Sequence, residues 1–96
     1  MFIQVATVKV QQGKEAEFES LVKSILPMVR QEKGTLQYVL HRSQDDFGKY
    51  LFYEKYTDKE AKEVHLSTPY VKEMINTATD LLSEKPSIAL YEEIAF

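Results

Sequence analysis

The 96-residue sequence contains no cysteine and no tryptophan, and it has only three glycines and three prolines. Without cysteine, the chain cannot form a disulfide scaffold, a thiolate zinc site, a redox CxxC pair or a cysteine nucleophile. The scarcity of glycine and proline, together with 44% hydrophobic residues, excludes a disordered or low-complexity chain. We therefore expect a single small domain over residues 1–96, too short for a second core.

An excess of basic charge and long apolar runs are also missing. The 12 Lys and Arg residues against 15 Asp and Glu residues give a net charge of −3, so the chain offers no basic surface for a phosphate backbone. No apolar run approaches the roughly 20 residues of a membrane span, and no basic segment precedes an apolar core at the start. We expect a soluble, cytoplasmic protein that binds neither nucleic acid nor membrane.

Hydrophobic periodicity predicts alternating strands and helices. Runs rich in β-branched and aromatic residues predict strands over residues 2–10, 35–43, 49–57 and 87–96. Three- and four-residue spacing predicts a helix over 14–33, closed by a left-handed Gly34, and a helical region over 58–82 that is broken at Thr68-Pro69. The order β-α-β-β-α-β is typical of an α+β, ferredoxin-like fold, in which two helices cover one face of a four-stranded antiparallel sheet.

Both faces of the predicted sheet are apolar. In the third strand, Tyr50 and Phe52 lie on one side, while Leu51 and Tyr53 lie on the other. A sheet with water on one face should instead alternate apolar and polar side chains. Because the helices suffice for one face only, we predict that a second copy of the sheet covers the other, in an obligate homodimer.

Two side chains suited to proton transfer fall on apolar faces. Pairing of Ser43 with Lys49 would set the hairpin register, and that register places Tyr38 opposite Glu54. His65 is expected to point from its helix toward the sheet, and an imidazole titrates near neutral pH, which makes it the candidate acid or base. In the alternative interpretation, Glu54 pairs with a cation or reaches solvent, and His65 is a hydrogen-bonded core residue.

Aromatic side chains provide a candidate surface for an aromatic substrate. Six tyrosines are many for so short a chain, although as core residues they need no further function. The candidates for substrate binding are Tyr38, Phe52, Tyr56 and Tyr70. Neither histidine has a second histidine at metal-ligand spacing, and there is no glycine-rich phosphate loop, so no metal site and no nucleotide site is predicted.

Strings across most of the chain resemble the antibiotic biosynthesis monooxygenase superfamily, in particular its small quinol-monooxygenase-like members. The matching residues are Glu32, Gly34, Leu36, Tyr38, Phe52-Tyr53-Glu54, Tyr56, Ala61, His65 and Thr68-Pro69. The resemblance implies a dimeric α+β barrel in which each subunit holds a pocket between sheet and helices. Tyr70 stands where family sequences commonly have a second histidine, and the absence of tryptophan disfavours the haem-degrading relatives.

The resemblance implies a cofactor-independent monooxygenase that oxidises a small quinol-like aromatic with O₂. In that mechanism His65 accepts a phenolic proton, Glu54 orients or charge-stabilises His65, and the aromatic side chains bind the substrate. One alternative is isomerisation of a small phosphorylated keto-sugar, as in quorum-signal degradation, for which the cations that could hold phosphate are Lys23, Arg30 and Arg42. Another is a non-catalytic dimeric module that binds a small aromatic ligand or a partner protein.

Overall fold

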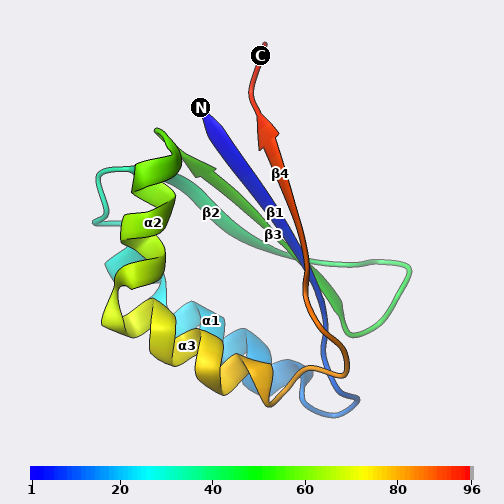
Figure 1. Cartoon of the computed structure of the whole chain (residues 1–96). Coiled ribbons are helices and arrows are strands. Elements are labelled where there is room, and N and C mark those ends of the chain that lie inside the picture. The colour runs from blue at the N-terminus through cyan, green and yellow to red at the C-terminus, as the bar shows by residue number, and fades with distance from the viewer. Residues whose placement is uncertain (96) are drawn as a thin grey trace.

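The computed structural model describes residues 1–95, which form a four-stranded antiparallel sheet with its helices on one side (Figure 1). In chain order, the elements are β1 (Phe2–Lys9), α1 (Glu15–Val29), β2 (Thr35–Arg42), β3 (Lys49–Tyr56), α2 (Lys59–Ser67), α3 (Pro69–Thr79) and β4 (Ser87–Glu92). The strand order is β2-β3-β1-β4. The predicted ferredoxin-like fold is confirmed. No helix within residues 1–95 has the length and hydropathy needed to cross a membrane.

Helix α1 is shorter than its periodicity predicts. Its buried face carries Phe18, Val22, Ile25 and Val29, at the expected spacing. The helix ends at Val29 and not at Lys33, and the next residues tighten into a turn in which the Glu32 N–H donates to the Val29 carbonyl at 3.0 Å. Pro27 lies inside the helix, as the sequence predicts, and its missing N–H weakens the last turn.

Gly34 has a different role from the one predicted. Positive φ angles occur at Gly13 and Gly48, so the prediction of a left-handed Gly34 is wrong. A Cβ at Gly34 would instead lie 2.5 Å from the Cβ of Ala61. Glycine is needed here because the start of β2 packs directly against α2.

The predicted break in the second helical region is present and is capped on both sides. The Asp58 carboxylate accepts from the Ala61 N–H at 2.8 Å and begins α2. The Thr68 hydroxyl accepts from the Val71 N–H at 3.4 Å, and Pro69 occupies the first turn of α3. The chain turns at Thr68, and α2 and α3 lie on the same side of the sheet (Figure 1).

The strand register confirms the hairpin prediction. Tyr38 lies opposite Glu54, and Leu40 lies opposite Phe52. A bulge between Thr35 and Gln37 shifts the pairing at the start of β2. Strand β4 ends at Glu92, so it is shorter than the predicted 87–96, of which Phe96 lies outside the described residues.

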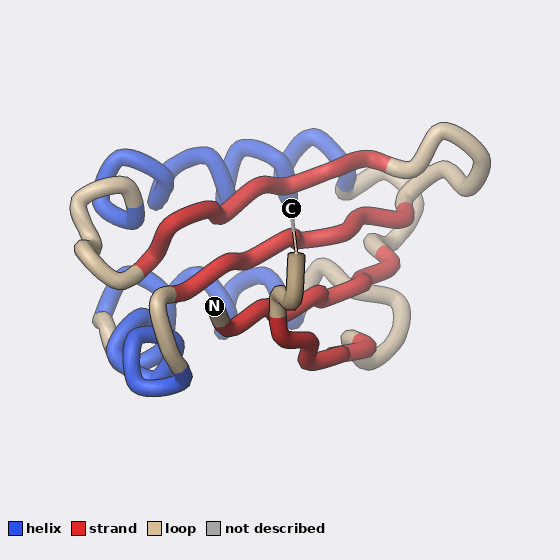
Figure 2. Tube along the Cα trace, turned by 90° about the horizontal axis from the view of Figure 1, so that it is seen from above, coloured by secondary structure: helices blue, strands red, loops and turns tan. Residues whose placement is uncertain are grey.

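The two faces of the sheet have different surroundings. On β3 the even-numbered side chains from Tyr50 to Tyr56 are buried against the helices. The opposite face carries the apolar side chains Val5, Val39, Leu51, Tyr53 and Tyr91. Figure 2 looks onto this face, with the strands in front of the helices, and no element of residues 1–95 covers it. The two-faced apolar pattern is confirmed, whereas the homodimer stays a prediction.

Candidate active site

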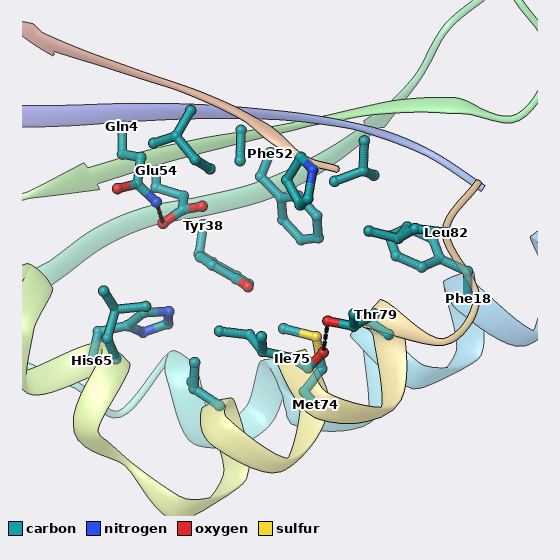
Figure 3. Close-up of a pocket in the computed structure, with 17 residues that line it drawn as sticks. Gln4, Phe18, Tyr38, Phe52, Glu54, His65, Met74, Ile75, Thr79 and Leu82 are labelled. Carbon is teal, nitrogen blue, oxygen red and sulfur yellow. Dashed lines mark hydrogen bonds between the residues drawn. The ribbon is translucent and has the colours of Figure 1, made fainter. Parts of the chain in front are cut away.

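A cavity of about 300 Å³ lies between the sheet and helices α2 and α3 (Figure 3). Its polar groups gather at one end, where Tyr38, Glu54 and His65 come from β2, β3 and α2. The remainder of the lining is mostly apolar and includes Phe18 and Phe52. A concave, largely apolar cavity with a few convergent polar groups is typical of a small-molecule site.

The structure brings four of the six predicted site residues together. Tyr38, Phe52, Glu54 and His65 line the cavity. Tyr56 lies behind Glu54 and donates to its Oε1 at 2.5 Å. Tyr70 contacts neither the cavity nor Glu54, because its hydroxyl donates to Glu32.

Glu54 is a buried carboxylate with one oxygen occupied and one directed at the cavity. Its Oε1 accepts from Tyr56 and from Gln4 Nε2, the latter at 3.3 Å, and the residue is 5% exposed. Burial raises the pKa of Glu54, and the hydrogen bond from Tyr56 and the field of His65 only partly offset this effect. No hydrogen bond within residues 1–95 engages Oε2, which leaves it available to a ligand.

The Tyr38 hydroxyl is a second polar group that has no hydrogen-bond partner within residues 1–95. The Tyr38 ring lies 4.9 Å from the His65 ring and 5.6 Å from the Phe52 ring, centroid to centroid. Burial, with the nearby carboxylates Glu54 and Glu32, raises the pKa of Tyr38, so its hydroxyl stays protonated. Figure 3 shows this hydroxyl pointing into the cavity, where it can donate to a ligand.

His65 is held from behind by a carboxylate that the sequence did not single out as functional. The side chain is 1% exposed, and its Nδ1 lies 2.8 Å from Glu32 Oε1. Glu32 also accepts from Thr35 Oγ1 at 2.7 Å and from Tyr70. We call Glu32, Thr35 and Tyr70 the anchor of His65.

The charge of the anchor determines which nitrogen of His65 is available. Burial alone would raise the pKa of Glu32, but hydrogen bonds from Tyr70, Thr35 and His65 hold it below the usual carboxyl value. An ionised carboxylate only accepts hydrogen bonds, so Nδ1 of His65 must carry a proton. In the neutral ring, Nε2 is therefore the bare nitrogen that can receive a proton from a ligand.

Sequence reasoning missed Glu32 and Gln4 as site residues. Glu32 belongs to the string that resembles the superfamily, and this was the one available signal. Glu32 lies 33 positions from His65 in the sequence, and periodicity within one helix or strand cannot predict a contact over that separation. The close packing of Gly34 on Ala61 brings the two segments together. Gln4 lies on the same face of β1 as the buried Ala6, a position for which the apolar pattern predicts no amide.

The cations proposed for a phosphate group lie elsewhere. Lys23, Arg30 and Arg42 flank a separate groove between α1 and β2, and Arg42 is engaged by Glu19 at 2.7 Å. Among the residues that the structure describes, no lysine and no arginine lines the cavity. Within residues 1–95, no group of three or more His, Asp or Glu side chains is arranged to hold a metal ion.

Sequence comparison identifies the family. Residues 1–77 match the profile of the family described as antibiotic biosynthesis monooxygenase. The chain belongs to this family. The new member is 29% identical over 83 residues to the "Putative monooxygenase YcnE" of Bacillus subtilis, covering 86% of this chain and 87% of that one. It is also 28% identical over 85 residues to the uncharacterized protein sll1783 of Synechocystis, matching 88% of this chain but only 58% of that relative's length.

Solved structures of the family share the fold over nearly the full length. The structure from Caulobacter crescentus CB15, described as a putative antibiotic biosynthesis monooxygenase, superposes with a TM-score of 0.93 at 32% identity, covering 98% of this chain and 90% of that one. A similarly described protein from Nitrosomonas europaea superposes with a TM-score of 0.94 at 19% identity, covering 99% and 100%. The family and its names support a monooxygenase-like role in general terms.

Proposed function

We propose that this family member is a monooxygenase that oxidises a small hydroquinone-type phenol with O₂ and uses no organic or metal cofactor. The observation that carries the proposal is the polar end of the cavity. There, the Tyr38 hydroxyl, Glu54 Oε2 and the Nε2 of an anchored His65 converge without partners in the described chain. A phenolic substrate supplies the matching donor and acceptor at its hydroxyl group.

His65 acts as the general base in the proposed reaction. Its Nε2 takes the phenolic proton, and the resulting phenolate transfers an electron to O₂ far more readily than the phenol. Glu32 and Glu54 flank the imidazolium that forms and stabilise its charge. Tyr38 donates to the phenolate oxygen and orients the ring.

Dioxygen is the oxidant, and the substrate supplies all four electrons. A new C–O bond forms at the ring carbon next to the phenolate, giving a hydroperoxide. The O–O bond then breaks, the hydrogen on that carbon leaves as a proton, and water departs. Hydroquinone and O₂ thus give hydroxybenzoquinone and one water, and His65 returns the proton it removed.

The isomerase alternative has less support from the site. A phosphorylated keto-sugar needs a cation or a cluster of backbone N–H groups for its phosphate. The three candidate cations, Lys23, Arg30 and Arg42, lie outside the cavity lining. Glu54 and His65 could shuttle a proton in either reaction, so the oxygen requirement separates the two.

Replacement of His65 tests the proposal. Oxygen uptake is measured with a panel of hydroquinones for the parent and for His65→Ala, with Val64→Ala as the control because Val64 is an exposed neighbour on the same helix. We expect a loss of about 10²–10⁴-fold in kcat/KM for His65→Ala and none for Val64→Ala. Equal rates for parent and His65→Ala would remove His65 from the mechanism, and binding without product would favour the non-catalytic module.

The homodimer forms part of the same proposal. The open face of the sheet carries Val5, Val39, Leu51, Tyr53 and Tyr91, an apolar set that one small subunit would otherwise leave to water. A second copy packed on this face would be self-complementary. The cavity lies between the sheet and the helices, on the side away from this open face, so the proposed dimer would leave the cavity uncovered.

Sedimentation of two matched variants tests the assembly. Val39→Glu places a charge on the open face, whereas Val64→Glu places the same charge on the outside of α2. We expect a dimer for the parent and for Val64→Glu, and a monomer or an unfolded chain for Val39→Glu. A folded monomeric parent at micromolar concentration would contradict the proposed dimer.

A further inference from the structure

We infer that the ligand of this cavity is an uncharged phenol with an apolar tail, and that the tail leaves the cavity between α3 and β4. The inference rests on the proposed function for the identity of the phenolic head. It goes beyond that function because it specifies the charge and the shape of the rest of the molecule. Three features of the cavity carry it: the position of its polar groups, the apolar rim and the absence of lining cations.

The polar groups are confined to the closed end of the cavity. Glu54 and His65 are almost fully buried there, beside Tyr38. The other side-chain hydroxyl in the lining, that of Thr79, donates to the Ile75 carbonyl at 2.7 Å and so is already satisfied (Figure 3). A ligand can therefore place polar atoms at the closed end only, and the rest of its surface must be apolar.

The opposite end of the cavity is open and has an apolar rim. The lining residues that reach solvent are on α3 and around the start of β4, where Ile75 is 43% exposed and Ile88 is 54% exposed. Leu90 follows Ile88 by two residues on the same face of the strand and extends the apolar surface outward. A tail leaving the cavity would contact this surface and shield it from water.

The rim has a fixed shape because its connecting segment is bonded to the end of β1. The Gln11 N–H donates to the Leu81 carbonyl at 2.8 Å, and the Ser83 N–H donates to the Lys9 carbonyl at 2.8 Å. These bonds hold the chain between α3 and β4 against the sheet. An opening held in this way is preorganised for a substituent and costs little ordering on binding.

The electrostatics of the site disfavour anionic ligands. Over residues 1–95, the cavity lining includes the carboxylate of Glu54 and no lysine or arginine. The ionised Glu32 lies directly behind His65. A carboxylated or phosphorylated phenol would bring a further negative charge into this low-dielectric space without a counter-charge. Neutral phenols are therefore selected over their acidic analogues.

Anaerobic calorimetry with a ligand series tests the inference without requiring turnover. The series is hydroquinone, methyl-, propyl- and pentylhydroquinone, with 2,5-dihydroxybenzoate as the anionic analogue. We expect the affinity to rise about fourfold for each methylene that is buried, the equivalent of about 0.8 kcal/mol. We expect 2,5-dihydroxybenzoate to bind at least about tenfold more weakly than hydroquinone.

A pair of matched variants locates the tail. Ile88→Ser removes apolar surface from the rim, and Ile94→Ser makes the same change at an exposed position outside the cavity lining. The gain in affinity from methyl- to pentylhydroquinone should be several-fold smaller in Ile88→Ser than in the parent. In Ile94→Ser, the gain should equal that of the parent. An equal rise in both variants would show that the tail does not pass Ile88 and would overturn the assigned exit.

Oxygen uptake on the same compounds separates this inference from the proposed function. A rising affinity without oxygen uptake supports the inferred ligand and contradicts the oxygenase. Oxygen uptake with an affinity that is flat across the alkyl series, or with 2,5-dihydroxybenzoate bound as tightly as hydroquinone, overturns the inference and leaves the oxygenase intact. Absence of binding by every compound overturns both.

Discussion

The two sides of the His65 ring differ in how fully their polar groups are paired. On one side, Glu32 accepts hydrogen bonds from Thr35 and Tyr70 and contacts Nδ1, so the anchor is saturated. On the other side, Glu54 Oε2 and the Tyr38 hydroxyl face a cavity without partners in the described chain. A network in which every polar group is paired fixes a side chain in place, whereas unpaired groups around a cavity are available to bind a ligand.

The two carboxylates also differ in the direction of their pKa shifts. The pKa of Glu32 is lowered by its hydrogen bonds despite burial, whereas the pKa of Glu54 is raised by burial. Environments that shift the pKa values of two titratable groups in opposite directions are typical of acid–base sites. In the proposed mechanism, this contrast corresponds to a positioning role for Glu32 and a role at the reacting centre for Glu54.

Of the changes to the groups around the His65 ring, Glu54→Gln should have the largest effect. The amide can keep the contacts with Tyr56 and Gln4 but cannot stabilise an imidazolium across the cavity, so kcat should fall by about 10²-fold.

The same variant should also change stability. Because the folded state raises the pKa of Glu54, its ionisation costs stability as pH rises above the usual carboxyl range. Urea unfolding at pH 7 should therefore show Glu54→Gln to be more stable than the parent, by on the order of 1 kcal/mol. A destabilised but fully active variant would assign Glu54 a structural role.

Glu32→Gln should reduce activity less and change stability in the opposite direction. Loss of the charge behind Nδ1 should lower kcat by about tenfold, because the imidazolium formed on His65 loses a stabilising neighbour. Because the folded state lowers the pKa of Glu32, its stabilisation is present above the usual carboxyl range and is lost as pH falls through the folded pKa. The variant should be about 1–3 kcal/mol less stable at pH 7. Rescue of activity by Glu32→Asp, which keeps the charge, would fit the same role, and a fully active Glu32→Gln would contradict it.

Two tyrosine-to-phenylalanine changes sharpen the contrast between paired and unpaired groups. Tyr38→Phe removes a hydroxyl with no intramolecular partner in residues 1–95, so stability should stay within about 0.5 kcal/mol while kcat/KM falls about three- to tenfold. Tyr56→Phe removes the donor to Glu54 and should cost about 1 kcal/mol or more. Thermal unfolding and oxygen uptake of both variants would show whether the two effects separate as expected. Similar stability losses in both would contradict the distinction.

The smallest effect is expected for Tyr70→Phe. The Tyr70 hydroxyl supports Glu32 and does not reach the cavity, so its loss should lower kcat about threefold and leave KM unchanged. A large rise in KM would instead place Tyr70 in contact with the substrate, as the sequence predicted. Steady-state kinetics on hydroquinone distinguish the two results.

Much of the fold follows from local sequence patterns. Alternation and three- to four-residue spacing predict every strand and helix, and the hairpin register places Tyr38 opposite Glu54 correctly. The errors lie at element ends, where Pro27 and the turn after Val29 shorten α1. Local geometry also misassigned Gly34, whose requirement is contact with Ala61 and not backbone conformation.

The candidate site was predictable only in part, because half of it depends on tertiary contacts. The sequence predicts Glu54 and His65 as partners, but Glu32 makes the direct contact with Nδ1 of His65. Tyr70 follows His65 by five residues, yet the turn at Thr68 directs it to Glu32 and away from the cavity. No spacing rule gives contacts between segments 33 positions apart.

Nitrogen NMR of the His65 ring tests the central claim most directly. The chain has two histidines, so one substitution, His41→Gln, assigns the signals. At neutral pH, the ¹⁵N shifts should show a proton on Nδ1 and a bare Nε2, and addition of pentylhydroquinone without oxygen should move the Nε2 signal. A neutral ring with its proton on Nε2 would contradict the assignment of His65 as the anchored base of the site. An Nε2 signal that does not move when the ligand binds would contradict it as well.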